Sequence, residues 1–288
     1  MSEFHGVTKG LRAALTERGF HPSRLRGQNF LLDENILRAI VRDAGVASGD
    51  RVLEVGCGPG TLTQCLLDAG AEVLSVEIEP RLLALARERI DAAAPWRWIE
   101  GDVLASKSRL LPELEAALDA WGTYDLVANL PYAITTPLLV LLAARAQPPR
   151  RMTVLVQLEA AERLCAEPGC KEFGAATVRL GARYAPRMTR TVPRQVFWPR
   201  PQVDSAVVRL DPRDGHLAPP EAQALEELVT KAFAMRRKRF VRTVEELASA
   251  AFWSALAAER GWPEGLRPEQ LALEDWLCAA RRLAALRS

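Results

Sequence analysis

Short runs of apolar and β-branched residues alternate with helical stretches through the first two-thirds of this chain. This alternation predicts a parallel sheet with helices on both faces, because each parallel strand needs a crossover before the next one. Ligands of such sheets bind at the carboxyl ends of the strands, so functional residues are expected directly after them. The predicted strands occupy residues 51–55, 72–76, 96–100, 125–128 and 152–157.

The pattern changes after the fifth predicted strand. Residues 187–192 and 203–210 are separated only by a proline-rich turn, which predicts an antiparallel hairpin at the edge of the sheet. Beyond it, residues 221–288 are rich in alanine, leucine, glutamate and arginine at helical spacing. The expected fold class is therefore α/β, a mostly parallel sheet with an antiparallel edge hairpin, followed by a small all-α domain.

Domain boundaries follow from the same changes of pattern. The sheet domain is expected over residues 1–212 and includes a helical N-terminal extension at 1–48. A linker is expected over 213–220, where proline, glycine and charged residues cluster. The helical domain then fills residues 221–288. A chain of 288 residues is long enough for two domains that each bury a core.

Composition narrows the class of protein. About half of the residues are hydrophobic and about a quarter are charged, as in ordinary globular proteins. The longest apolar run is too short to span a bilayer, and the first residues lack the features of a signal peptide. Five cysteines without a Cys-x-x-Cys pair or a histidine cluster argue against disulfides and metal sites. A reducing cytoplasm is therefore expected.

The net charge is only +2, but basic residues gather in two places. Residues 179–213 hold eight arginines against two aspartates, and residues 231–242 hold six basic residues and no acid. Local patches of this kind are typical of surfaces that bind phosphate backbones. The alternative is the solvated face of a surface element, and the charges alone leave both interpretations open.

The first predicted strand runs into a glycine-rich loop, Gly56-Cys57-Gly58-Pro59-Gly60, that opens a helix. Glycines let the backbone turn sharply and approach a ligand closely. A dinucleotide-binding fingerprint would place its third glycine at position 61, which is Thr61. The Gly-x-Gly-x-Gly spacing is instead typical of enzymes that bind S-adenosyl-L-methionine. The alternative is a tight strand-to-helix turn without a ligand.

Two acids favour a ligand at this loop. Glu77 ends the second predicted strand about twenty residues further on, where an acid can accept both ribose hydroxyls. Asp102 follows the third predicted strand and can accept from an adenine amine. Either acid alone is more often a helix cap. The ordered set of glycine loop, Glu77 and Asp102 is hard to attribute to capping.

The fourth predicted strand ends in Asn129-Leu130-Pro131-Tyr132. The exocyclic amine of adenine is a poor nucleophile, because its lone pair is delocalised into the ring. The Asn129 side-chain oxygen and the Leu130 carbonyl are candidates to hold its two hydrogens out of plane. Pro131 makes the turn rigid, and Tyr132 can stack on the base. The alternative interpretation is a simple turn after a strand.

A second aromatic ring is needed to sandwich a base that has left its stack. The stretch from Phe197 to Pro201 offers two rings, and its prolines stiffen the turn. Phe197 or Trp198 is expected to face the pocket, although either ring can equally belong to the core. For Trp198 alone, the core or an RNA contact is favoured.

Together these motifs closely resemble those of the ribosomal RNA adenine N6,N6-dimethyltransferases of the small-subunit type. The resemblance runs over nearly the whole chain, and its combination of motifs is far more specific than any single one. The matching segments are 27–31, 54–63, 76–79, 101–103, 129–139, 156–157, 159–163, 197–208, 236–238 and 267–276.

The resemblance implies a Rossmann-like class I methyltransferase with S-adenosyl-L-methionine as methyl donor. Its implied reaction is transfer of two methyl groups to N6 of each of two adjacent adenosines near the 3′ end of small-subunit (16S) rRNA. The implied partner is small-subunit rRNA or a 30S assembly intermediate during ribosome biogenesis. We expect a cytoplasmic monomer.

The resemblance and the motifs above give three sets of expected site residues. The cofactor-binding residues are Gln28, Asn29, Leu31, Gly56, Gly58, Gly60, Glu77, Ile78, Asp102, Val103 and Asn129. The catalytic residues are Asn129, Leu130, Pro131, Tyr132 and Phe197. The RNA-binding residues are Arg200, Arg236, Arg237 and Lys238.

Several positions depart from the family pattern. Cys57 stands in the glycine loop where the family usually has proline, and Phe173 stands where tyrosine is usual. Leu158 replaces a common lysine, and Arg200 replaces a common proline. These departures bear on substrate contacts more than on the donor site.

Three alternatives differ in class. An Erm-type methyltransferase of large-subunit (23S) rRNA shares both motifs, but residues 267–276 argue against it. A non-catalytic rRNA-binding assembly factor would not need the intact Asn129 and Tyr132. A nicotinamide oxidoreductase is disfavoured by Thr61 and by the lack of an obvious catalytic histidine or lysine.

Overall fold

The structure is a computed structural model that describes residue 8, residues 10–23 and residues 28–288. Gly27 of the family-like segment 27–31 and residues 1–7 of the expected helical extension lie outside these residues. None of the helices in the described part of the chain is long and apolar enough to cross a membrane.

Two compact units make up the chain. The first comprises residues 1–161 and 187–211, and the second comprises residues 162–186 and 212–288. The structure therefore groups residues 162–186 with the helical part of the chain. Within the second unit, Gly181 lies so close to Leu273 that an added Cβ would stand 3.0 Å from its side chain. The division of function between the two parts stays a prediction.

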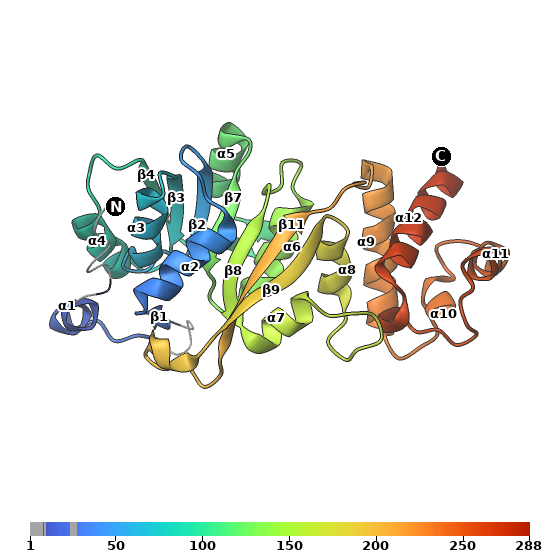
Figure 1. Cartoon of the computed structure of the whole chain (residues 1–288). Coiled ribbons are helices and arrows are strands. Elements are labelled where there is room, and N and C mark those ends of the chain that lie inside the picture. Colours follow the sequence, from blue (N-terminus) through green and yellow to red (C-terminus); the bar gives the residue numbers. More distant parts are fainter. Residues whose placement is uncertain (1–7, 9, 24–27) are drawn as a thin grey trace. The chain divides into compact units, whose positions relative to one another are not determined.

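Within the described residues, the first unit is built on a seven-stranded sheet of strand order β4-β3-β2-β7-β8-β11-β9 (Figure 1). The first five strands of this order run parallel. They confirm the five predicted strands to within one residue, and their bounds are β2 (Arg51–Val55), β3 (Glu72–Glu77), β4 (Trp96–Glu100), β7 (Asp125–Asn129) and β8 (Met152–Gln157).

The order of these strands decides where a site can form. β2 lies between β3 and β7, so the chain leaves β2 toward one side of the sheet and later returns on the other side. The carboxyl ends of β2 and β7 are therefore neighbours at the point where the strand order reverses. Such a switch point is the usual place for a ligand in a doubly wound sheet.

Both faces of the sheet are covered, as expected for parallel strands. Val52 and Val73 face helices on one side, whereas Leu53 and Leu74 are buried on the other. In Figure 1, α2 crosses in front of the strands and α6 lies behind them. The helices of this unit are α1 (Leu11–Glu17), α2 (Glu34–Ala44), α3 (Thr61–Asp68), α4 (Pro80–Arg89), α5 (Pro112–Trp121) and α6 (Thr135–Ala144).

β11 (Ser205–Pro212) pairs antiparallel with β8. β9 (Tyr184–Val192) pairs with β11 and is the edge strand of the sheet. This confirms the predicted edge hairpin. The turn between its strands holds η1 (Arg194–Val196) and β10 (Phe197–Trp198), and β10 pairs antiparallel with β1 (Phe30–Leu31). The small hairpin of β5 (Leu104–Ser106) and β6 (Arg109–Leu110) completes the strands.

The second unit is helical, which confirms the predicted small all-α part, and its apolar side chains form one core. α9 (Pro219–Ala234) and α12 (Leu273–Arg287) lie side by side in Figure 1. The remaining helices are α8 (Ala175–Gly181), α10 (Phe240–Val244), α11 (Ala250–Arg260) and η2 (Pro268–Gln270), and α7 (Leu158–Leu164) spans the boundary between the units.

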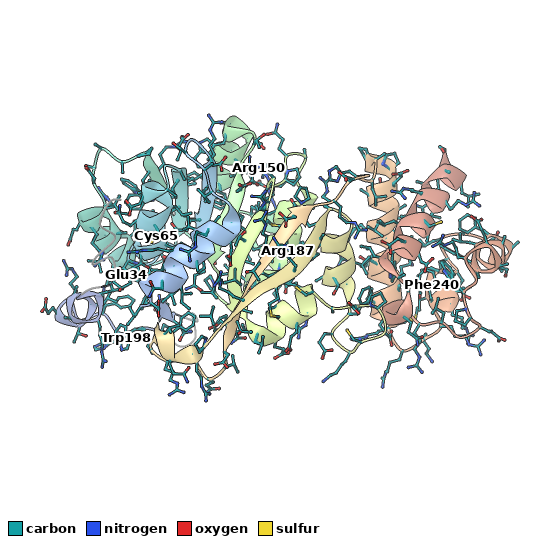
Figure 2. All side chains as sticks on the ribbon, viewed as in Figure 1. Glu34, Cys65, Arg150, Arg187, Trp198 and Phe240 are labelled. Carbon is teal, nitrogen blue, oxygen red and sulfur yellow. The ribbon has the colours of Figure 1, made fainter. Side chains whose placement is uncertain are left out.

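Aromatic packing holds this core together around Phe240, which is labelled in Figure 2. The rings of Trp253, Trp262 and Trp276 meet the Phe240 ring edge-on, with centroid distances of 5.9, 5.5 and 5.2 Å. Edge-on contacts of this kind add to the stabilisation from burial alone.

We predict that Phe240→Ala lowers the free energy of unfolding of the second unit by about 3–5 kcal/mol, because it leaves a cavity among three tryptophans. Urea unfolding followed by tryptophan fluorescence measures this change. Leu286→Ala is the control, since Leu286 is 56% exposed and should change the free energy by less than about 0.5 kcal/mol. Equal unfolding midpoints for wild type and Phe240→Ala would contradict this description of the core.

Candidate active site

A cavity of about 210 Å³ opens at the carboxyl ends of β2, β3 and β7, beside the loop that follows β4. Its walls come from five segments that are far apart in the sequence. The principal lining residues are Gln28–Leu31, Glu54–Pro59, Val76–Ile78, Gly101–Val103 and Asn129–Ile134. The parallel sheet therefore brings the glycine loop, both predicted acids and the Asn-Leu-Pro-Tyr motif to one place.

The glycine loop needs glycine at two positions that line this cavity. Gly56 has φ +75°, and an added Cβ would stand 3.5 Å from the Pro131 ring. Gly58 has φ +55°, and its Cβ would stand 3.4 Å from the Phe30 ring. Positive φ strains any residue that carries a Cβ. The loop thus approaches the acceptor motif on one side and the N-terminal segment on the other.

Gly60 does not line the cavity, although the sequence predicts that it binds the cofactor. It is the N-cap of α3, with φ +81°. A Cβ there would stand 3.0 Å from Ile90 and 3.1 Å from Ala86. The position therefore serves the close approach of α3 to the segment of α4.

Glu77 is buried and shapes the loop through its carboxylate. Its Oε2 accepts from the Gly58 backbone N–H at 2.8 Å, and its Oε1 accepts from the Glu79 N–H at 2.9 Å. Burial raises the pKa of Glu77, and these backbone donors offset part of the rise. Each carboxylate oxygen has a second lone pair, so Glu77 can still accept from ribose hydroxyls.

Asp102 is exposed at the cavity rim. Its Oδ1 accepts from the Leu104 N–H at 2.9 Å, and its Oδ2 has no hydrogen-bond donor among the described residues. The predicted residues Ile78 and Val103 also line the cavity, and Ile78 is 45% exposed. An apolar pair next to a free carboxylate oxygen suits a flat ring with an exocyclic amine.

Asn129 is oriented by a contact with the N-terminal segment. Its Nδ2 donates to the Asn29 carbonyl at 3.4 Å, so the amide oxygen is left free to accept. The Leu130 N–H donates to the Leu155 carbonyl at 3.1 Å, while no donor within the described residues reaches the Leu130 carbonyl. Two acceptors are thus available at the turn. The Pro131 carbonyl closes it by accepting from the Ile134 N–H at 3.2 Å.

Tyr132 lines the cavity and is half-buried. Burial raises the pKa of its phenol, and the Ser205 hydroxyl offsets part of that rise. The phenol is therefore neutral at physiological pH. A neutral ring at the mouth of the cavity can stack on a base without adding charge.

Phe197 is not at this cavity in the described structure. It pairs with Leu31 in the β1–β10 ladder and is buried in the core with Val192 and Val207. Its part in holding a base stays a prediction. Trp198 stacks on Phe30 with centroids 6.2 Å apart, and Figure 2 shows it beside the N-terminal helix. Phe30 is the ring that this segment contributes to the cavity wall.

Sequence reasoning missed Glu54, which lines the cavity and is only 1% exposed. Its Oε2 accepts from the Thr63 hydroxyl at 2.6 Å and from the Ser75 hydroxyl at 2.9 Å. Ser75 in turn accepts from the Trp96 indole N–H at 2.9 Å. Burial raises the pKa of Glu54 to about 7. The available signal was an acid between the apolar Leu53 and Val55, directly before the glycine loop.

The predicted RNA-binding residues lie outside the cavity. Arg200 is exposed in the first unit. In the second unit Arg236 donates to the Lys171 carbonyl at 2.7 Å, so part of its role is structural. Arg237 and Lys238 are exposed just beyond α9 and contact no acid among the described residues. These two cations are therefore available to a polyanion.

Comparison with known proteins points to one family. The family model described as ribosomal RNA adenine dimethylase matches residues 22–284. The protein of Phenylobacterium zucineum named ribosomal RNA small subunit methyltransferase A is 39% identical over 277 residues, covering 95% of this chain and 94% of the relative. Its namesake in Lactiplantibacillus plantarum is 39% identical over 274 residues, covering 92% and 91%.

Solved structures show the same fold. The crystal structure of the 23S rRNA methyltransferase ErmE has a TM-score of 0.70 at 24% identity and covers 88% of this chain and 99% of its own. A dimethyladenosine transferase from Plasmodium falciparum has a TM-score of 0.65 at 22% identity and covers 86% and 94%. The Rossmann-like class I methyltransferase sheet is thereby confirmed.

We predict that the unfolding free energy of the wild type falls as pH rises toward neutrality and that Glu54→Gln removes this fall. A native pKa of about 7, against 4.5 for the free side chain, means that only the native state keeps the proton between these pH values. Stability of the wild type therefore falls as pH rises through this window. Glutamine keeps an acceptor for Thr63 and Ser75 but has no proton to lose.

Relative to Glu54→Gln, the wild type should lose up to about 3 kcal/mol of unfolding free energy between pH 4.5 and pH 7.5. Urea unfolding at both pH values measures the difference. The exposed Glu100→Gln is the control and should track the wild type. A gap between wild type and Glu54→Gln that does not change with pH would contradict the assignment.

Proposed function

The chain belongs to the ribosomal RNA adenine dimethylase family, and from this premise we propose that it dimethylates two adjacent adenosines near the 3′ end of small-subunit rRNA. Family and fold make it an S-adenosyl-L-methionine-dependent methyltransferase that acts on adenine in ribosomal RNA. The relatives named for the small subunit favour this substrate over the large-subunit RNA of the Erm-type alternative.

The cavity fits S-adenosyl-L-methionine by the chemistry of its walls. When bound, this cofactor supplies a methyl group on a sulfonium centre, which is the electrophile. Glu77 offers acceptors for ribose hydroxyls, and the free oxygen of Asp102 offers one for an adenine amine. Gly56 has a positive φ and lines the cavity without a side chain, so its backbone can approach the cofactor closely.

The observation that carries the proposal is the hydrogen bond from the Asn129 amide nitrogen to the Asn29 carbonyl. With its nitrogen engaged, Asn129 presents an oxygen as acceptor, and the Leu130 carbonyl stands beside it. Two acceptors can hold the two hydrogens of an adenine amine out of the ring plane. The nitrogen lone pair is then less delocalised into the ring, so the amine is a better nucleophile. The residues act by position and electrostatics and need no strong base.

The finer points of substrate and setting are part of the proposal. We place the reaction on a 30S assembly intermediate, with the enzyme as a cytoplasmic monomer. The free cations Arg237 and Lys238 support contact with the RNA backbone, as does Arg200 in the first unit. The acceptor pair at Asn129 argues against a purely non-catalytic assembly factor, since such a protein would have no use for it.

We predict that Asn129→Ala lowers methyl transfer by at least about 100-fold, because one of two preorganised polar contacts is lost. Tyr132→Ala should abolish measurable transfer, because the ring that stacks on the base is lost. Transfer of labelled methyl groups to undimethylated 30S particles measures both. Binding of 30S particles should stay largely intact, and the exposed Asn35→Ala should behave as wild type. Wild-type rates in Asn129→Ala or Tyr132→Ala would refute the pocket assignment.

We predict that 30S particles are methylated by the wild-type protein and that protein-free 23S rRNA is not. Mapping of the modified nucleotides identifies the product. Two adjacent N6,N6-dimethyladenosines near the 3′ end of 16S rRNA would agree with the proposal. Modification of 23S rRNA alone would assign the chain to the large-subunit type instead.

We predict that replacing Arg237 and Lys238 by glutamine weakens RNA binding regardless of sequence and reduces its salt dependence. Loss of two phosphate contacts should lower the slope of log K against log salt by about 1.4–1.8. The control is Arg260→Gln/Arg282→Gln, which removes the same charge from residues paired with Asp275 and Glu259. An unchanged slope in the first variant, or an equal loss in the control, would count against this contact.

A further inference from the structure

An exposed indole lies on the outer edge of the sheet, apart from the cavity of the candidate active site. Trp98 belongs to β4, the first strand in the sheet order, and is 39% exposed. Its ring lies against that of Trp96, with centroids 4.9 Å apart and planes inclined by 46°. Trp96 is buried in the core, and its ring supports the Trp98 ring on the side that faces the protein.

Arg87 on α4 completes this surface. Its guanidinium stacks over the Trp98 ring at 4.8 Å from the centroid. Neighbouring Glu88 does not neutralise it, because Glu88 pairs with Arg18 at 2.5 Å. Arg87 forms no ion pair within the part of the chain that the structure describes. The result is a flat π surface beside a guanidinium that has no ion-pair partner among the described residues.

A second cavity, of about 400 Å³, adjoins the two tryptophans and Arg87. Its volume falls in the range of small-ligand pockets, about 300–1,000 Å³. The wall of this cavity is apolar at Ile90 and Ala94, and two acids line it, Asp91 and the Glu88 that pairs with Arg18. Asp91 uses Oδ1 to accept from the Ala93 N–H at 2.9 Å, which leaves Oδ2 for another donor.

These features match the chemistry of an unpaired nucleotide better than that of other ligands. Bases of single-stranded RNA stack on aromatic rings and on guanidinium planes, and the phosphate favours a free cation. A carboxylate oxygen beside the stack can accept from an exocyclic amine of the base.

We propose that Trp98, Arg87 and Asp91 form a second RNA contact, which binds one unpaired nucleotide of the rRNA substrate. This inference rests on the proposed function for the presence of RNA. The base extends the stack that Trp98 and Arg87 form, the positive charge of Arg87 attracts the phosphate, and Asp91 accepts from the base amine. Trp98 stands four residues before Asp102, so the chain places the two at most about 13 Å apart. One folded RNA can therefore reach both the contact and the candidate active site.

The first test compares Trp98→Leu with Trp98→Phe in the whole protein. Leucine keeps apolar cover but cannot stack, whereas phenylalanine can. Trp98→Leu should raise the KM for 30S particles on the order of tenfold, leave kcat and the Kd for S-adenosyl-L-methionine unchanged, and melt at the wild-type temperature. Trp98→Phe should stay within a few-fold of wild type. Equal KM values for wild type and Trp98→Leu, or equal losses in both variants, would overturn the proposal.

The second test uses a short single-stranded oligoribonucleotide and an abasic strand of the same length and charge. Fluorescence anisotropy should show that the wild type binds the oligoribonucleotide more tightly and that Trp98→Leu loses this preference. Arg87→Gln should weaken binding of both strands. If Trp98→Leu impairs binding of 30S particles but leaves the oligoribonucleotide preference intact, the surface contacts a ribosomal protein and the proposal is wrong.

These outcomes are separable from failure of the proposed function. If wild-type protein transfers no methyl group to 30S particles, the proposed function fails, while the oligoribonucleotide preference still decides the Trp98 contact. If methyl transfer is normal and Trp98→Leu changes neither KM nor the preference, only the second RNA contact fails.

Discussion

The close approach of the Gly56 backbone to the Pro131 ring is the contact on which the site depends. Gly56 follows β2 and Pro131 follows β7, and the two strands are parallel neighbours. A Cβ at position 56 would stand at ordinary contact distance from Pro131, 3.5 Å, but the backbone there has φ +75°, which favours glycine. This contact sets the glycine loop, proposed to bind the methyl donor, directly against the turn proposed to hold the adenine amine.

Hydrogen bonds from backbone and hydroxyl groups then hold the polar side chains of the cavity in place. Glu77 is held by the Gly58 and Glu79 N–H groups, and Glu54 by the Thr63 and Ser75 hydroxyls. Neither carboxylate has a cation as its partner in these contacts. Burial therefore raises both pKa values. Positive charge is instead available outside the cavity, where RNA would approach.

Much of this arrangement could be predicted from the sequence, because parallel strands place their carboxyl ends together. Glu77 and Asn129 end their strands, and Gly56 and Asp102 follow theirs, so the alternating pattern was enough to predict that they converge. Local motifs did not reveal long-range packing. The sequence leaves Phe197 in the pocket or in the core, and its pairing with Leu31 across the chain places it in the core, while its part in holding a base stays a prediction.

The remaining differences have the same origin. Gly60 is predicted to bind the cofactor, and this stays a prediction; in the structure it also allows a close approach to Ile90 and Ala86, which a Cβ would crowd. Glu54 was missed because the hydroxyl groups that donate to its buried carboxylate, from Thr63 and Ser75, belong to two other elements. Trp98 shows no signal in the sequence, since its exposure and its stack with Arg87 arise only when α4 packs beside β4.

The most direct measurement is a crystal structure of the chain with S-adenosyl-L-methionine bound. We predict that the sulfonium end of the donor lies between Gly56 and Asn129, the ribose at Glu77 and the adenine beside Asp102. Density for the donor at any other place, or an Asn129 amide oxygen turned into the protein interior, would contradict it.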